Sequence, residues 1–455
     1  MFLVRDVSGL IKAYDVRGVV PDELDDDLAR DIGRCFGALI APAASVVIGH
    51  DMRESGVSLV QAFAEGVMAQ GIDVLRIGLA STDQLYFASG KLDIPGAMFT
   101  ASHNPAKYNG IKMCYAGARP VGQETGLNQI KEWISTGTVP TVETDKPGTA
   151  RDQDMLTAYA EHLHSLVDIS ANRRLKVVVD AGNGMGGHTA PACFAGLPLE
   201  IVPMYFELDG SFPNHEANPI EPKNVADLRA RVVAEKADIG LAFDGDADRC
   251  FVIDELGDIV SPSTITALVA ARELKREPGS SIIHNLITSR AVPEIVRELG
   301  GTPVRTRVGH SFIKAEMAET GAIFGGEHSG HFYFRDFWKA DSGMLAALHT
   351  LDALGEHDGT LSGLLAKYCR YPSSGEINST VTDAASVVTA VEAAYTGQDG
   401  VEIDHLDGLT VTHADWWFNL RASNTEPLLR LNAEAADGPT MECVRDDVLA
   451  LVTKG

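Results

Sequence analysis

Short apolar runs that each end in a polar loop recur along this chain. Residues 45–49, 176–179 and 281–283 form such runs, and the loops at 50–51, 180–187 and 284–290 precede stretches of helical character. Strands that alternate with helices indicate α/β units with largely parallel sheets, whose functional loops lie at the carboxyl ends of the strands. Beyond residue 371 the pattern changes, because apolar strands at 416–420 and 428–431 flank a polar loop. We expect a different, α+β domain there.

Breaks rich in Thr, Pro, Gly and Ser at residues 135–149, 257–263 and 371–375 divide the chain further. A chain of 455 residues is too long for one ordinary core. We therefore expect three related α/β domains with mixed or parallel sheets at residues 1–150, 151–257 and 258–370. A C-terminal α+β domain is expected at residues 371–455.

Three carboxylates follow the apolar run at 239–243, namely Asp244, Asp246 and Asp248. Their mutual repulsion is relieved most easily by a cation, and carboxylate oxygens suit Mg²⁺, which keeps room for a phosphate or a water. An EF-hand fits poorly, since Arg249 stands where that loop requires glycine and strand patterns flank it. An aspartyl-phosphate phosphotransferase with Asp244 as nucleophile is a stronger alternative. A solvated acidic turn is disfavoured because the preceding strand has the pattern of a buried one.

A second polar loop, residues 100–105, follows the apolar segment 95–99. Ser102 beside His103, with Lys112 further on, resembles an activated hydroxyl with basic neighbours, although an ordinary hydrogen-bonded loop gives the same pattern. No G-x-S-x-G motif is present, which disfavours a serine-hydrolase triad.

Two further loops suit a phosphorylated sugar. In residues 325–331, glycines permit a close approach while Glu327 and Ser329 can bind hydroxyl groups; a tight β-turn is the alternative, and no zinc spacing includes its histidines. In residues 421–427, Arg421 and the later Arg430 combine with hydroxyl and amide donors that match a phosphate monoester. A helix-capping loop would leave both arginines unexplained.

Residues 180–187 contain G-x-G-x-x-G after a strand, so a nicotinamide-dependent oxidoreductase is a competing hypothesis. Pro191 interrupts the helix that should follow, and a dinucleotide site leaves the other loops unexplained. A non-catalytic sugar-phosphate-binding protein is a third possibility. The proline-rich segment 209–222 is predicted to be an ordered loop, and the sequence assigns it no role.

The composition of the chain limits which kinds of molecule it is expected to bind. A formal charge of −25 argues against nucleic acid and anionic membranes. Six cysteines without a C-x-x-C pair are typical of reduced thiols, and neither a signal peptide nor a run of ~20 apolar residues is evident, so a cytoplasmic protein is expected.

Taken together, the loops resemble those of the α-D-phosphohexomutases. The matching pieces cover the whole chain, in order: residues 14–18, 100–105, 244–249, 326–331 and 421–427. The resemblance implies four domains around a central cleft, each giving one loop. Because the last domain is expected to be a separate one, we also expect it to close over the substrate. It also implies an isomerase that interconverts hexose 6-phosphate and hexose 1-phosphate. The phosphoryl group would pass through phosphoserine at Ser102 and a hexose 1,6-bisphosphate, with one Mg²⁺ per chain.

The resemblance also implies a role for each site residue. Metal ligands would be Ser102, Asp244, Asp246 and Asp248, and the catalytic groups Ser102, His103, Arg17, Lys112, His310 and His331. Substrate contacts would come from Tyr14, Arg249, Glu327 and Ser329. The non-reacting phosphate would be held by Arg421, Ser423, Asn424, Thr425 and Arg430.

This sequence departs from relatives of that family at two places. The loop at 282–290 lacks the lysine that members often carry, with only Arg290 nearby, and His328 stands where phosphoglucosamine mutases have Gln. The resemblance implies a phosphomannomutase that also acts on glucose phosphates, and a phosphoglucosamine mutase is the alternative within the family, which His328 disfavours. We expect a monomer or a weak homodimer that binds hexose phosphates.

Overall fold

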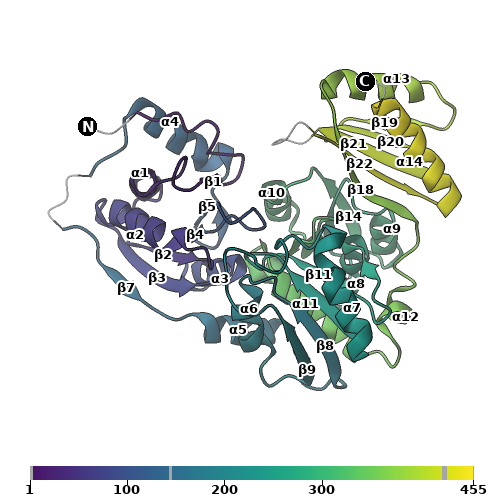
Figure 1. The fold of residues 1–455 in the computed structure, drawn as a ribbon, viewed down its shortest axis with the longest axis horizontal. Coiled ribbons are helices and arrows are strands. Elements are labelled where there is room, and N and C mark those ends of the chain that lie inside the picture. The colour runs from purple at the N-terminus through teal and green to yellow at the C-terminus, as the bar shows by residue number, and fades with distance from the viewer. Residues whose placement is uncertain (1–3, 143–145, 423–427, 454–455) are drawn as a thin grey trace.

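The computed structural model describes residues 4–142, 146–422 and 428–453, and places them in four sheets that follow one another along the chain (Figure 1). The first three sheets mix parallel and antiparallel strands, and the fourth is antiparallel throughout. The expected fold class is confirmed.

The first sheet has the order β1-β5-β4-β2-β3-β7, with β6 beside β5. Strands β2, β3, β4 and β7 run parallel, while β1 and β5 form an antiparallel edge. The strands are β1 (Val16–Val19), β2 (Ser45–His50), β3 (Asp73–Leu79), β4 (Gly96–Phe99), β5 (Tyr108–Tyr115), β6 (Arg119–Pro120) and β7 (Ala150–Asp152). The helices are α1 (Asp26–Leu39), α2 (Ser55–Met68), α3 (Thr82–Leu92) and α4 (Asn128–Thr136), with a short π-helix at η1 (Gln123–Leu127).

The second sheet has the order β12-β11-β10-β8-β9, and its central strand β10 is buried at every position. Such a strand needs cover on both faces, which explains its continuous apolar sequence. The strands are β8 (Leu175–Asp180), β9 (Leu199–Met204), β10 (Ile239–Phe243), β11 (Cys250–Ile253) and β12 (Ile259–Val260). The helices are α5 (Leu156–Leu166), α6 (Gly186–Phe194), η2 (Pro222–Val225) and α7 (Ala226–Glu235).

The third sheet repeats this plan with the order β14-β13-β15-β16-β17. Its strands are β13 (Ser281–Asn285), β14 (Thr302–Thr306), β15 (Phe324–Gly326), β16 (Phe332–Phe334) and β17 (Ala340–Asp341). Its helices are α8 (Pro262–Arg276), α9 (Ala291–Glu298), α10 (His310–Thr320), η3 (Arg335–Phe337), α11 (Gly343–Gly355) and α12 (Leu361–Leu365).

The fourth sheet has the order β18-β22-β21-β20-β19 and lies apart from the others at the upper right of Figure 1. Its strands are β18 (Ser373–Thr380), β19 (Glu402–Asp404), β20 (Leu409–Thr412), β21 (Trp416–Ala422) and β22 (Leu428–Ala435), covered by α13 (Ala384–Tyr395) and α14 (Gly438–Val452). One apolar core runs continuously from the first sheet through the third, whereas the fourth sheet has a core of its own.

The boundaries expected at residues 150, 257 and 370 stay predictions. In the structure, β7 and β12 extend the first and second sheets slightly past the first two of them.

Candidate active site

The metal-type loop turns directly from β10 into β11. Asp244, Asp246 and Asp248 are each at most 1% exposed, and each offers a carboxylate oxygen within 4.8 Å of the others. The turn closes because Ala247 adopts a positive φ of 59°, which a small residue tolerates best.

Two cationic side chains form ion pairs with this loop, and one hydroxyl donates a hydrogen bond to it. Lys112 Nζ lies 2.8 Å from Asp246 Oδ2 and 2.7 Å from Asp248 Oδ2, and Arg249 Nε lies 2.8 Å from Asp244 Oδ2. The Thr82 hydroxyl donates to Asp246 Oδ2 at 2.6 Å.

The loop retains unused acceptor capacity. Asp246 Oδ1 and Asp248 Oδ1 are buried and accept no hydrogen bond from the described residues. Buried carboxylate oxygens without donors are the ligands that a hard divalent cation takes. The donor set therefore fits Mg²⁺.

The surroundings shift the pKa values of two of these carboxylates in opposite directions. Burial raises the pKa of Asp244 despite Arg249 nearby. Burial acts the same way on Asp246, but the charge and hydrogen bond of Lys112 bring its pKa well below the usual range. Lys112 in turn has its pKa raised well above normal, since the two aspartates outweigh its own burial.

Ser102 reaches this loop from the first domain. It follows β4, adopts a φ of 48°, and donates from Oγ to Asp244 Oδ2 at 2.8 Å. His103 Nδ1 lies 3.1 Å from the same hydroxyl and 2.6 Å from Arg249 Nη2. Because Arg249 donates to Nδ1, that nitrogen is the unprotonated one. Burial first and the charge of Arg249 second lower the pKa of His103 well below normal.

Arg17, on β1, contacts the loop that carries Ser102. Its Nη1 donates to Asn104 Oδ1 at 2.6 Å, and it pairs with Asp15. Tyr14, just before it, is 40% exposed. The expected proximity of Arg17, Ser102, Lys112 and the three aspartates is thus present, drawn from two sheets.

The loop between β15 and β16 belongs to the third sheet and contributes further residues to this site. Glu327 is 2% exposed and accepts from Asn285 Nδ2 at 3.1 Å, the Gly309 N–H at 3.1 Å and Tyr333 Oη at 2.7 Å. Ser329 Oγ lies 2.9 Å from His331 Nδ1.

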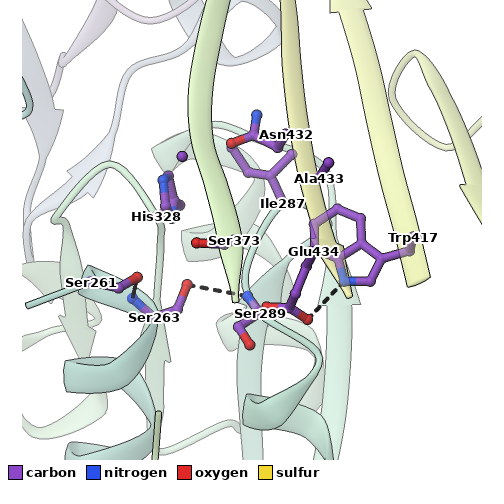
Figure 2. Close-up of a pocket in the computed structure, with 11 residues that line it drawn as sticks. Ser261, Ser263, Ile287, Ser289, His328, Ser373, Trp417, Asn432, Ala433 and Glu434 are labelled. Carbon is purple, nitrogen blue, oxygen red and sulfur yellow. Dashed lines mark hydrogen bonds between the residues drawn. The ribbon is translucent and has the colours of Figure 1, made fainter. Parts of the chain in front are cut away.

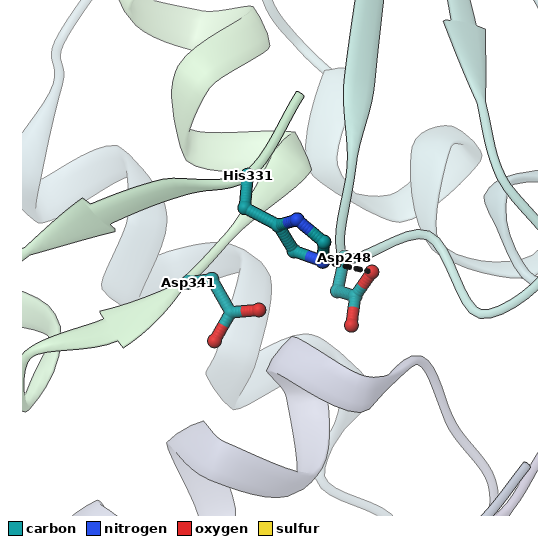
Figure 3. A group of neighbouring side chains, drawn as sticks. All are labelled: Asp248, His331 and Asp341. Atoms are coloured by element: carbon teal, nitrogen blue, oxygen red, sulfur yellow. Dashed lines mark ion pairs between the residues drawn. The ribbon is translucent and has the colours of Figure 1, made fainter. Parts of the chain in front are cut away.

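His331 faces the metal-type loop. Its Nε2 lies 3.7 Å from Asp248 Oδ1, and Asp341 stands beside both (Figure 3). Asp341 Oδ1 forms an ion pair with Lys314 Nζ at 2.7 Å. The same Nζ lies 4.1 Å from the centre of the Tyr86 ring. The sequence hypothesis did not include Asp341, Lys314 or Asn285, because each becomes a neighbour only through the fold.

The two arginines of the fourth domain stand opposite one another, since Arg421 on β21 is in register with Arg430 on β22. Arg430 Nη1 lies 3.5 Å from Glu376 Oε1. The predicted contacts Ser423, Asn424 and Thr425 lie outside the described residues, as does the side chain of His310 at the start of α10.

A small pocket lies at the interface between the third and fourth domains, which we call the seam (Figure 2). His328, Ser289 and Trp417 line it, and Glu434 accepts from Trp417 Nε1 at 2.9 Å and from the Arg290 N–H at 3.0 Å. Arg290 Nη1 donates to the Ala414 carbonyl at 2.9 Å, so this arginine bonds the third domain to the fourth across the seam.

The glycine-rich loop 180–187 supports the metal-type loop. Met185 N–H donates to the Gly245 carbonyl at 2.9 Å, and a Cβ on Gly184 would lie 2.7 Å from that oxygen. Its glycines therefore serve packing between loops, which removes the reason for expecting a dinucleotide there.

The comparisons with known proteins agree with this architecture. Family models described as phosphoglucomutase/phosphomannomutase α/β/α domains I, II and III match residues 9–139, 157–257 and 261–371, and the C-terminal domain model matches 376–451.

Full-length relatives agree as well. The chain is 39% identical over 451 residues to a phosphomannomutase of Escherichia coli K12, covering 97% of this chain and 98% of that one. It is 41% identical over 447 residues to a protein of Xanthomonas campestris named phosphohexose mutases, covering 98% and 99%. A crystal structure of a phosphoglucomutase/phosphomannomutase family protein from Burkholderia thailandensis superposes with a TM-score of 0.89 at 34% identity, over 100% of this chain and 98% of that one.

Fold and comparisons define an intramolecular phosphotransferase of the isomerase class, a phosphohexomutase. The chain belongs to the α-D-phosphohexomutase family.

No helix of the described residues has both the length and the apolar character needed to cross a bilayer.

Proposed function

We propose that this chain interconverts mannose 6-phosphate and mannose 1-phosphate, and accepts glucose phosphates, through a phosphoryl group carried on Ser102. The observation that supports this most directly is the 2.8 Å contact between Ser102 Oγ and Asp244 within the loop of three buried carboxylates. The E. coli relative is named for mannose phosphates and the X. campestris relative for hexose phosphates, which supports this choice of substrates.

The reaction is a transfer of PO₃ between two oxygens. The free hydroxyl of the hexose phosphate attacks phosphorus, the bond to Ser102 Oγ breaks, and a hexose 1,6-bisphosphate results. After this intermediate reorients, its other phosphate returns to Ser102, so the enzyme ends in the form in which it began. The residues proposed to move protons and to stabilise charge are Arg17, Lys112 and His331, with His103 fixing the serine and His310 nearby.

Positioning and neutralisation of oxygen charge are most of what such a reaction needs. Ser102, Asp244, Asp246 and Asp248 are proposed to hold one Mg²⁺, which would withdraw charge from the phosphoryl oxygens. More distant structures of the same fold, from an Aspergillus fumigatus N-acetylphosphoglucosamine mutase, hold magnesium in one case and glucose 1,6-bisphosphate in another.

Recognition is proposed to be shared between domains. Tyr14, Arg249, Glu327 and Ser329 would contact the sugar, and the non-reacting phosphate would lie against Arg421, Ser423, Asn424, Thr425 and Arg430. We also propose a monomer or a weak homodimer; light scattering behind a sizing column tests this. A cytoplasmic location is proposed from its free cysteines.

The test is a coupled assay of mannose, glucose and glucosamine 1-phosphates with bisphosphate and Mg²⁺. Ser102→Ala should lower kcat by about 10³-fold or more, because among the described residues no other hydroxyl donates to Asp244. Ser165→Ala, an exposed serine on α5, is the matched control. Full turnover in Ser102→Ala would transfer the nucleophile role to Asp244.

A further inference from the structure

Arg53, just after β2, makes an unusual set of contacts. Its side chain is 1% exposed, and all five of its N–H groups donate hydrogen bonds. Nε donates to Asp51 Oδ2 at 3.2 Å, Nη1 to the carbonyls of Pro105 and Tyr108 at 2.9 Å each, and Nη2 to those of Ser102 at 2.9 Å and Asn104 at 2.7 Å. One guanidinium thus binds four carbonyls of the segment 102–108, which we call the serine loop.

The serine loop needs such support at Ser102 itself. The φ of 48° is left-handed, a conformation that costs an ordinary residue about 1–2 kcal/mol. It turns the Ser102 carbonyl toward Arg53, while Oγ points to Asp244 on the other side. A bond that holds the carbonyl therefore also fixes the direction of the hydroxyl.

Only arginine can do this. The planar fork presents donors to several acceptors at once, whereas the ammonium group of lysine has three donors at one atom. Two of the carbonyls bond Nη1 and the other two bond Nη2, so a cation with a single donor atom would leave two or more of them unpaired.

The second domain covers Arg53. The ring of Phe212 lies 5.2 Å from the guanidinium carbon, and a Cβ on Gly210 would come within 2.9 Å of Arg53 Cα. This covering segment, residues 209–217, belongs to the proline-rich loop that had no role assigned from sequence.

The covering segment is in turn tied to the glycine-rich loop 180–187. Asp209 N–H donates to the Asn183 carbonyl at 3.0 Å, Asn214 Nδ2 donates to Asn183 Oδ1 at 2.8 Å, and His215 Nε2 lies 3.1 Å from Asp180 Oδ2. Since that loop also bonds Gly245, the second domain holds the serine loop and the metal-type loop together.

We propose that Arg53 is a positioning residue that fixes the serine loop for phosphoryl transfer, and that residues 209–217 hold Arg53 in place. For its effect on turnover the inference rests on the proposed function. All five donors of Arg53 are taken by Asp51 and by the serine loop, which leaves none to bind a substrate or to stabilise transferring oxygens.

The experiment compares Arg53→Lys with Arg76→Lys, an arginine of the same domain whose Nε lies 2.8 Å from the exposed Asp152. In Arg53→Lys, kcat should fall about 100-fold with KM changed less than about 3-fold, as expected for a misplaced reacting atom. Hydrogen exchange of a peptide covering residues 102–110 should become about 10-fold faster, with other peptides unchanged. Arg76→Lys should match the wild type in all three.

Two further variants complete the test. In Arg53→Ala, added guanidinium should restore at least about 10-fold of the lost kcat, and it should restore nothing in Ser102→Ala. Phe212→Leu should speed exchange in the same peptide and lower kcat by a smaller factor. If Arg53→Ala does not fold, the Arg53→Lys and Phe212→Leu results decide.

The inference is wrong if Arg53→Lys has the hydrogen-exchange rates and the kcat of the wild type. It is also wrong if exchange becomes faster by the same factor in every peptide of the folded variant. If the wild type itself has no mutase activity, the proposed function fails. The exchange comparison still decides whether Arg53 holds the loop.

Discussion

Thr82 is a single buried hydroxyl that contacts the proposed metal site. It is fully buried, and its Oγ1 donates to Asp246 Oδ2 while its N–H donates to the Asp246 carbonyl at 3.0 Å. A hydroxyl that orients a ligand carboxylate is typically worth 10-fold or more in metal affinity.

We therefore expect Thr82→Val, which keeps the shape, to raise the Mg²⁺ concentration for half-maximal activity about 10-fold. Titration of activity against Mg²⁺ measures this, with Thr389→Val on α13 as control, because that hydroxyl bonds only its own helix at Ala385. An unchanged Mg²⁺ requirement would mean that the Thr82 bond contributes nothing to the site.

Residues that act as contiguous motifs were predictable, and those that act across the fold were not. The Asp244–Asp246–Asp248 loop and Ser102 follow strand-like runs, so their places at the ends of β10 and β4 could be predicted from the sequence. Arg53 and Thr82 carry no local pattern, because each acquires its role only when distant loops meet.

Between elements, the Asp180–His215 contact joins the end of β8 to the covering segment. Burial alone would lower the pKa of His215, but the hydrogen bond and charge of Asp180 raise it above the usual value near 6.5. The protonated pair therefore contributes its full stability below about pH 6.5, and this contribution is lost as pH rises through the raised pKa.

His215→Gln should then cost about 1 kcal/mol of unfolding free energy at pH 6 and clearly less at pH 9. Urea unfolding of both proteins at the two pH values measures the difference. His405→Gln, whose side chain is 58% exposed beside Glu392, should cost little at either pH. A cost that grows with pH would contradict the assignment.

The position of strands was predictable, but their partners were not. Apolar runs mark β2, β8 and β13, and the predicted strands at 416–420 and 428–431 lie within β21 and β22. The antiparallel edge formed by β1 and β5 was missed, because pairing depends on register and not on apolar content.

At the scale of the molecule, Asp83 ties three domains together. Its carboxylate accepts from Tyr159 Oη at 2.6 Å and from Ser342 Oγ at 2.6 Å, which belong to the second and third domains, and also from Ser81. Burial raises its pKa to about 6.

Asp83→Ala should lower the free energy of the first unfolding transition by about 3 kcal/mol, since three buried hydroxyls lose their acceptor. Denaturant unfolding followed by fluorescence measures it. Asp152→Ala, whose side chain is 76% exposed in its pair with Arg76, should change it by less than about 1 kcal/mol. Equal effects of the two substitutions would refute the role of Asp83.

The seam to the fourth domain depends on Glu434. Glu434→Ala leaves the Trp417 and Arg290 N–H donors without their acceptor, so the domain that carries Arg421 and Arg430 is held less firmly. We expect KM for hexose 1-phosphate to rise about 10-fold, or 1.4 kcal/mol, with a smaller change in kcat. Steady-state kinetics test this against Glu442→Ala on the exposed side of α14. An unchanged KM would show that the seam does not affect substrate binding.

The shared core of the first three sheets and the separate core of the fourth also determine how this enzyme can be recombined with its relatives. A chimaera that takes its C-terminal domain from another family member cuts polar contacts such as those of Arg290 with Glu434, Arg305 with Asp404 and Val308 with Asp407. It leaves the apolar core shared by the first three sheets intact. Grafting any one of the first three domains would instead mismatch apolar surfaces that were shaped together. Natural or engineered exchange of segments should therefore preserve residues 4–370 as a block and vary the C-terminal domain.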